Sequence, residues 1–155
     1  MPRAQHLAIR VSDIKRSTEF YVTGLGGSLI SAPRIVEGPI SIFPGATYYA
    51  TFVELSDGFG IELIQFLSPA HETVSRPQTE RGFMHFAIDV DDVEAVLRRI
   101  EELGIGSHEG LGAFGDSPTK YVYVRDPDGN TIEVNNTTWD DVMATAKDLL
   151  PEVSL

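Results

Sequence analysis

Two histidines and two glutamates stand at matching places in the sequence and could hold a metal ion. His6 and His85 each open a similar segment, at an offset of 79 residues, and Glu62 and Glu133 each close an Asp-Gly-x-x-Ile-Glu segment, at an offset of 71. Imidazole and carboxylate groups that converge can bind Ni, Zn, Co, Mn or Fe(II). A single polar residue on a strand is usually just solvated, so the hypothesis depends on the four side chains meeting.

The repeated segments predict strands that would position these residues. Apolar residues alternate with other residues over 6–11 and again over 85–90, as in strands with one buried face. Glu62 and Glu133 each lie between two apolar residues, so both carboxylates are expected on the face opposite the core. If the two halves fold about a pseudo-twofold axis, the four side chains come toward a common centre.

Each half is expected to fold as a βαβββ unit. A helix with Asp91 as its N-cap and Glu94 three residues later ends at Gly104. A less regular helix begins near Ser12 and ends in the glycines at 24, 26 and 27. The β-prone runs are 28–36, 46–55 and 60–66 in the first half, and a weak run near 108, then 120–124 and 131–135, in the second. The turn 126–129 joins the last two strands as a hairpin.

These units predict one α+β domain over residues 1–155. Module 1 covers about 5–68, a connector 69–81, module 2 about 82–136, and a C-terminal helix about 138–150. The eight strands are expected to form a curved, mostly antiparallel sheet. The amphipathic C-terminal helix is expected to pack on that sheet, with a dimer contact as the alternative.

Composition excludes several classes of function. Twelve Lys and Arg against 23 Asp and Glu give a net charge of −11, which disfavours nucleic acid and anionic membranes as partners. The absence of cysteine excludes disulfides and thiolate chemistry. The segment 110–115 matches Gly-x-Gly-x-x-Gly, but no apolar strand precedes it and Pro118 follows, so we expect a loop over the predicted sheet and no nucleotide cofactor. No membrane-spanning run is found, and a cytoplasmic location is expected.

The sequence resembles the vicinal oxygen chelate superfamily, which includes glyoxalase I, methylmalonyl-CoA epimerase, extradiol dioxygenases and bleomycin- and fosfomycin-resistance proteins. The resemblance covers about residues 5–136. It is carried by His6-Leu-Ala-Ile-Arg-Val-Ser-Asp-Ile, Ser17-Thr-Glu-Phe-Tyr21, Leu25-Gly26, His85-Phe-Ala-Ile-Asp-Val-Asp-Asp-Val and Tyr123-Val-Arg-Asp-Pro-Asp-Gly-Asn-Thr-Ile-Glu133. It implies paired βαβββ modules that form an open cup, with His6, Glu62, His85 and Glu133 as ligands of one divalent metal ion.

The resemblance is closest to glyoxalase I-like members. Arg10 falls where glyoxalase I holds a carboxylate of glutathione, although an ordinary salt bridge explains it equally well. The Asn130-Thr131 pair replaces the aromatic residue usual in that branch, so glutathione is left open as a substrate. Tyr123 and His108 are further candidates for contact with the substrate, His108 as a proton shuttle.

We therefore expect a metal-dependent lyase or isomerase that acts on a small substrate with vicinal oxygens. The metal would stabilise an enediolate, and a glutamate ligand, by resemblance Glu133 with Glu62 as its counterpart, would move the proton. The alternatives are a non-catalytic protein that sequesters a ligand, and an Fe(II) extradiol-type dioxygenase. This sequence lacks the histidine that an extradiol dioxygenase would have near 114–116. Glu62 would also crowd the open metal positions that a dioxygenase needs. The cup could be completed within one chain or across a homodimer.

Overall fold

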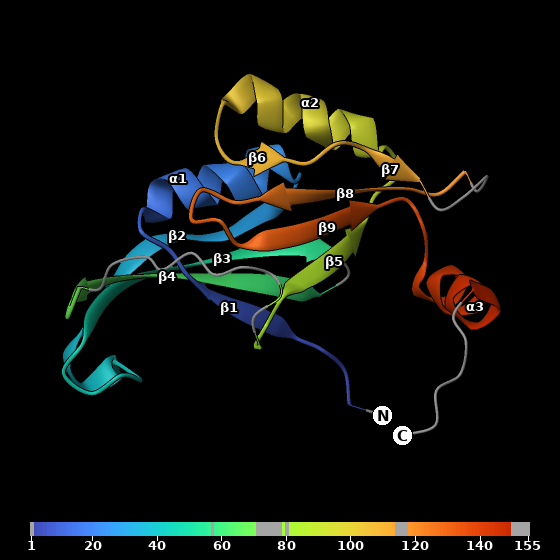
Figure 1. Ribbon diagram of the computed structural model, residues 1–155. Coiled ribbons are helices and arrows are strands. Elements are labelled where there is room, and N and C mark those ends of the chain that lie inside the picture. The colour runs from blue at the N-terminus through green and yellow to red at the C-terminus, as the bar shows by residue number, and fades with distance from the viewer. Residues whose placement is uncertain (1, 57, 71–78, 80, 114–117, 150–155) are drawn as a thin grey trace.

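The computed structural model describes residues 2–56, 58–70, 79, 81–113 and 118–149 (Figure 1). Most of the predicted connector and part of the glycine-rich loop lie outside these residues. No helix of the described part is long and apolar enough to cross a membrane.

The first half of the chain has the expected order of elements, and the second half adds one short strand, Gly112–Ala113, inside the segment 110–115 that the sequence predicted as a loop. The first half contains β1 (His6–Arg10), α1 (Ile14–Glu19), a π-helical turn η1 (Phe20–Gly24), β2 (Ser28–Val36), a 3-10 turn η2 (Gly38–Ile40), β3 (Thr47–Ser56) and β4 (Phe59–Ser68). The second contains β5 (His85–Asp89), α2 (Val93–Leu103), the short β6 (Ser107–His108) and β7 (Gly112–Ala113), then β8 (Lys120–Arg125) and β9 (Thr131–Asn135). Helix α3 (Trp139–Leu149) follows. The α+β class and the paired modules are confirmed.

The strands form two sheets, where the sequence predicted one sheet of eight strands. The first has the order β1-β4-β3-β2 and the second β5-β9-β8-β6, with β7 also paired to β8. In each sheet the first strand of the module pairs in parallel with the last, and the other pairings are antiparallel. Strands β1 and β5 are edge strands of their sheets. Their outer backbone groups have no strand partner within the described chain, so no hydrogen bonds join the two halves into one sheet.

The helix ends follow the sequence with one shift. Asp13 caps α1 and accepts hydrogen bonds from the backbone N–H groups of Lys15 and Arg16. Asp92, and not the predicted Asp91, caps α2 through the backbone N–H of Ala95. Both aspartates are capable caps, and the helix begins at Val93, which leaves Asp92 as the residue directly before it. Gly104 ends α2 with a φ of 63°, as predicted for a left-handed C-cap.

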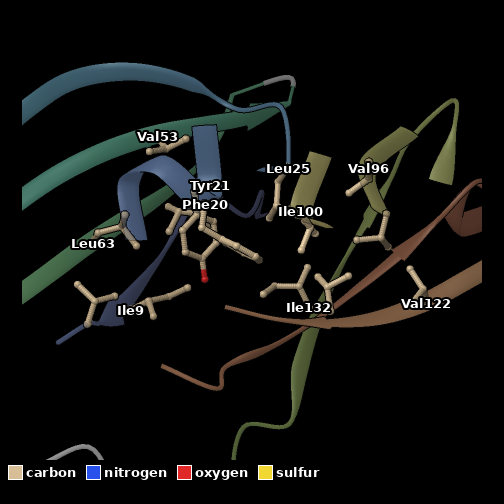
Figure 2. Packing of buried hydrophobic residues seen from close by; sticks show 14 of the residues in the cluster. Ile9, Phe20, Tyr21, Leu25, Val53, Leu63, Val96, Ile100, Val122 and Ile132 are labelled. Carbon is tan, nitrogen blue, oxygen red and sulfur yellow. The ribbon is translucent and has the colours of Figure 1, made fainter. Parts of the chain in front are cut away.

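One hydrophobic core serves both modules (Figure 2). Ile61 and Leu63 on β4 and Val122 and Ile132 in the second sheet are fully buried in it, together with Phe20 from η1. The alternate residues on these strands point away from this core. The polar residues between the buried ones therefore lie on the outer face of each sheet.

A buried hydrogen bond connects the two modules. The hydroxyl of Tyr21, which has no exposed surface, donates to Oδ2 of Asp126 at 3.0 Å. Asp126 belongs to the β8–β9 turn and also accepts hydrogen bonds from both the backbone N–H and the side-chain amide of Asn130. Burial raises the pKa of the Asp126 carboxyl, and these hydrogen bonds oppose that shift. The turn predicted as a hairpin connection thus also fixes the second module to the first.

Helix α3 does not pack as expected. Figure 1 shows it to one side of the two sheets, where the chain leaves β9. Trp139, at its start, is 72% exposed. The predicted packing on the sheet is wrong at this residue. An amphipathic pattern identifies a face that can be buried, but it does not identify the surface that covers that face.

We predict that the substitution Tyr21→Phe lowers the free energy of unfolding by about 1 to 3 kcal/mol, because it removes a hydrogen bond to a buried charged acceptor. Urea unfolding followed by circular dichroism measures this loss. Tyr48→Phe is the matched control, since Tyr48 is also buried but has no hydroxyl hydrogen bond recorded within the described chain. Equal losses in the two variants would contradict the role given to the Tyr21–Asp126 contact.

Candidate metal centre

Parallel pairing places one histidine beside one glutamate in each sheet. In the first sheet Glu62 pairs with Ala8, two residues after His6 on β1. In the second sheet Glu133 pairs with Ala87, two residues after His85 on β5. Because side chains alternate along a strand, each histidine shares a face with its glutamate, on the side away from the core. The two halves therefore present the same His/Glu pair at the same register.

The spacing within each pair suits two ligands of one ion. His6 Nε2 lies 3.8 Å from an Oε2 of Glu62, and His85 Nε2 lies 3.3 Å from Oε2 of Glu133. Two ligand atoms that are each about 2.1 Å from a tetrahedral metal ion lie about 3.4 Å apart. Both separations are longer than the short contact of a strong charged hydrogen bond, which is about 2.8 Å. The donor set and its spacing fit a divalent ion.

The second nitrogen of each histidine differs between the halves. His6 Nδ1 lies 2.9 Å from Oε1 of Gln5, so a proton on Nδ1 leaves Nε2 free to bind a metal. His85 Nδ1 is buried, and no hydrogen-bond partner is found for it among the described residues. Unlike His6, His85 therefore has no recorded hydrogen bond on its second nitrogen that would orient the ring for a metal at Nε2.

The two pairs do not meet within one chain. Among the described residues, no group of three or more His, Asp or Glu side chains is placed to share a metal ion. The convergence expected from the repeat is therefore absent in the single chain. Each chain presents two separate His/Glu pairs, each a candidate half-site for a metal ion, one on the outer face of each sheet.

Tyr123 lies beside the second pair. It pairs with Glu133 across β8 and β9, and its ring centroid is 5.4 Å from that of His85. Burial, the negative charge of Glu133 and a hydrogen bond to that carboxylate together raise the pKa of the Tyr123 hydroxyl. The structure thus places Tyr123 against the proposed ligands, where it holds Glu133.

Sequence reasoning missed Asn135. Its side-chain amide donates to Oε1 of Glu133 at 3.1 Å, and it is buried. The residue follows Glu133 by two positions, so the same alternation that placed Glu133 on the outer face could have found it. After Tyr123, the buried Asn135 amide is therefore a second contact that fixes the Glu133 carboxylate.

Arg10 shares the outer face of β1 with His6. It is exposed and pairs with Ile64 on β4. No ion pair of Arg10 is recorded within the part of the chain that the structure describes. Its guanidinium is therefore available to an anionic group near the first pair.

His108 lies away from both pairs. It pairs with Val124, a core residue of β8, so it points to the side of the sheet opposite Glu133. Its Nε2 lies 3.0 Å from Oε1 of Glu101 on α2, and its Nδ1 lies 2.9 Å from the backbone oxygen of Glu109. These contacts tie β6 to α2, and we leave His108 out of the proposed site.

An aromatic cluster lies on the outer face of the first sheet, four residues along β4 from Glu62. Phe43, Tyr48 and Phe66 contact one another with ring centroids 5.2 to 5.6 Å apart. Tyr48 and Phe66 share the outer face of the sheet with Glu62, and Phe52, 41% exposed, pairs directly with Glu62. Phe52 can contact an apolar group of a ligand, whereas Tyr48 is only 3% exposed and packs with Ala50 and Ile64 in a second buried cluster.

The fold and the His/Glu pairs can be compared with known proteins. The family model described as Glyoxalase/Bleomycin resistance protein/Dioxygenase superfamily matches residues 3–134. The chain belongs to this superfamily. It is 30% identical to a lactoylglutathione lyase of Pseudomonas aeruginosa, over 83% of this chain and 79% of that one.

Two solved structures show the same superfamily fold. The trypanothione-dependent glyoxalase I of Leishmania major superposes with a TM-score of 0.67 at 24% identity, over 96% of this chain and 97% of that one. The fosfomycin resistance protein FosX of Mesorhizobium loti superposes with a TM-score of 0.62 at 17% identity, over 92% and 98%. Superfamily members thus share the architecture across different activities, and the activity must be argued from the site.

We predict that His108→Gln affects pH-dependent stability and leaves metal binding unchanged. Hydrogen bonds to the Glu109 backbone and the Glu101 carboxylate raise the pKa of His108 above 6.5 despite some burial. A raised pKa in the folded state stabilises the protein fully below about pH 6.5 and loses this effect as the pH rises through the folded pKa.

Urea unfolding at pH 5.5 and 8.5 measures this contribution. The wild-type protein is expected to exceed the variant by a few tenths to about 1 kcal/mol at pH 5.5 and by less at pH 8.5, because Glu101 is exposed. Loss of metal binding in the variant would instead show that His108 belongs to the site.

Proposed function

We propose that the protein is a metal-dependent lyase or isomerase of the glyoxalase I type. The observation that carries this proposal is the pair of matching His/Glu half-sites, at equal register in both sheets. The relative named lactoylglutathione lyase supports the same activity class. The substrate would be a small molecule with two neighbouring oxygens.

The chain's own residues have separate tasks in this proposal. His6, Glu62, His85 and Glu133 would hold the ion, which when bound supplies Lewis-acid polarisation of the two substrate oxygens. One of the glutamates removes the proton from the carbon next to the polarised carbonyl and returns it to the neighbouring carbon. Such proton transfer by a positioned carboxylate contributes about 10² to 10⁴ in rate.

Neighbouring residues would orient the substrate. Arg10 is exposed on the same face as His6 and would bind a carboxylate of the substrate. Phe52, 41% exposed and paired with Glu62, would contact an apolar part of it. Contacts at a charged end and at an apolar end of the substrate would together align its two oxygens between the two half-sites.

We propose that two copies of the chain complete each site. The two pairs lie apart in one chain, and the edge strands β1 and β5 each leave one side open to another strand. A homodimer that brings β1 of one copy near β5 of the other would unite His6 and Glu62 with the partner's second pair. The same contact would cover both open edges.

Exposed aromatic side chains of the first module support a second candidate function. Phe43 and Phe52, 38% and 41% exposed, could also hold a bulky apolar ligand without turnover. In that case the protein would sequester a ligand, and binding would not depend on metal. The effect of a chelator separates this function from the enzyme.

We predict that the protein, purified without a polyhistidine tag, contains about one divalent ion per chain. A homodimer has two shared sites, and each site offers four nitrogen and oxygen ligands. Elemental analysis measures the metal. Removal with EDTA is expected to abolish isomerisation of the hemithioacetal of methylglyoxal, and an added divalent ion should restore it. Ligand binding that persists at full strength in the metal-free protein would favour the sequestering function, and oxygen uptake with catechols would favour the dioxygenase.

We also predict that two inactive variants restore each other when mixed. One variant carries His6→Ala and Glu62→Ala, and the other His85→Ala and Glu133→Ala. In a mixed dimer one site receives both intact pairs, so metal binding should return at half of the sites of that dimer.

The mixing experiment uses co-refolded chains and counts bound metal against the separate variants. Light scattering gives the oligomeric state. A monomer in solution, or a mixture that binds no more metal than its components, would contradict the shared site. The metal content and activity of the wild-type protein would still test the proposed enzyme.

A further inference from the structure

The two half-sites differ in the neighbours of their glutamates. Glu133 is paired with Tyr123 across the sheet, and Asn135 follows it by two residues on the same face. At the equivalent places around Glu62 stand Phe52 and Ile64. The register is the same in both halves, so the difference lies in the chemistry of these two pairs of neighbours.

Glu133 is held by two groups besides its paired histidine. Its Oε1 accepts a hydrogen bond from the Asn135 amide at 3.1 Å, and its Oε2 lies 3.3 Å from His85 Nε2. The hydroxyl of Tyr123 is also hydrogen-bonded to the carboxylate. Asn135 is itself fixed, since it is only 5% exposed and its side-chain oxygen accepts from the backbone N–H of Thr137.

Glu62 has much weaker support. Within the described chain its recorded polar contact is His6, at 3.8 Å. Phe52 and Ile64 can donate no hydrogen bond to it. The side chains of both glutamates are 16% exposed, so a difference in access to water does not explain the contrast.

We infer that the two carboxylates of the proposed centre hold the ion unequally, with Glu133 as the fixed ligand and Glu62 as the exchangeable one. Asn135 and Tyr123 are then positioning residues that act through Glu133. A ligand ordered before the ion arrives loses less conformational freedom on binding, and its supporting hydrogen bonds keep one oxygen directed to the site. Glu62 must be ordered by the ion itself. This inference rests on the proposed metal centre.

The assignment differs from the one that family resemblance suggests. Resemblance gives the loosening role to Glu133, whereas the hydrogen bonds in this chain fix Glu133 and leave Glu62 free to leave the ion. The first module would therefore supply the side of the centre where a substrate oxygen replaces a ligand. Phe52, which pairs with Glu62, would then contact the substrate close to that position.

The test compares the two glutamates by titration with Co²⁺, whose visible absorption reports its ligand set. Glu62→Gln should retain most of the affinity, and Glu133→Gln should bind Co²⁺ about 10-fold or more weakly than Glu62→Gln. Circular dichroism checks that both variants are folded. Equal affinities of the two variants, or the reverse order, would overturn the inference.

The positioning residues are tested separately. Tyr123→Phe combined with Asn135→Ala should weaken Co²⁺ binding by about 10- to 100-fold, the loss typical of outer-shell partners. Ile64→Val is the control on the first module, at the place equivalent to Asn135, with an expected change under about 2-fold because Ile64 supports no ligand and the substitution removes only one methylene from a buried side chain. Tyr123→Phe alone serves if the double variant does not fold, and unchanged affinity in a folded variant would overturn the positioning role.

The wild-type titration distinguishes the two proposals. Wild-type protein that binds no Co²⁺ would contradict the metal centre itself, together with the inference drawn from it. If the wild-type protein binds Co²⁺ and the variants of both modules lose affinity equally, the metal centre is supported. Only the unequal roles of the two glutamates are then overturned.

Discussion

The site depends on the parallel pairing of the first and last strands of each module. This pairing brings His6 beside β4 and His85 beside β9, and its register places each histidine on one face with a glutamate. A shift of one residue would turn the glutamate toward the core, where Ile61 or Ile132 now lies. The buried residues on either side of each glutamate resist such a shift, so the hydrophobic core fixes the position of the polar pair.

The same core keeps the pairs apart. Buried residues from both sheets pack in one cluster with Phe20 and Tyr21, and the Tyr21–Asp126 hydrogen bond fixes the second module to the first. Each sheet consequently turns its polar face away from the shared interior. Edge strands β1 and β5 are left open, which is the physical basis for proposing that a second copy completes the centre. The superfamily fold supplies this scaffold, while the residues around each pair determine its chemistry.

The repeat preserves backbone geometry more closely than side-chain chemistry. Strand register around Glu62 and Glu133 is equivalent, yet one glutamate is surrounded by Phe52 and Ile64 and the other by Tyr123 and Asn135. Backbone pairing is maintained by burial of the alternate residues, which both halves share. The outer-face neighbours Ile64 and Asn135 are also buried, at 3% and 5% exposed, but they lie outside the core that both modules share, so their side-chain chemistry can differ between the halves.

The sequence by itself determined the modules, most strand positions, the Gly104 helix end and the His/Glu pairs, because alternation and local turn chemistry are properties of neighbouring residues. It placed the cap of α2 one residue early, since Asp91 and Asp92 are equally able to cap a helix. Only the tertiary structure decided that the sheet divides in two, that His108 faces α2, that Trp139 is exposed and that Asn135 holds Glu133. Each of these depends on contacts between residues or faces whose partners a local pattern does not specify.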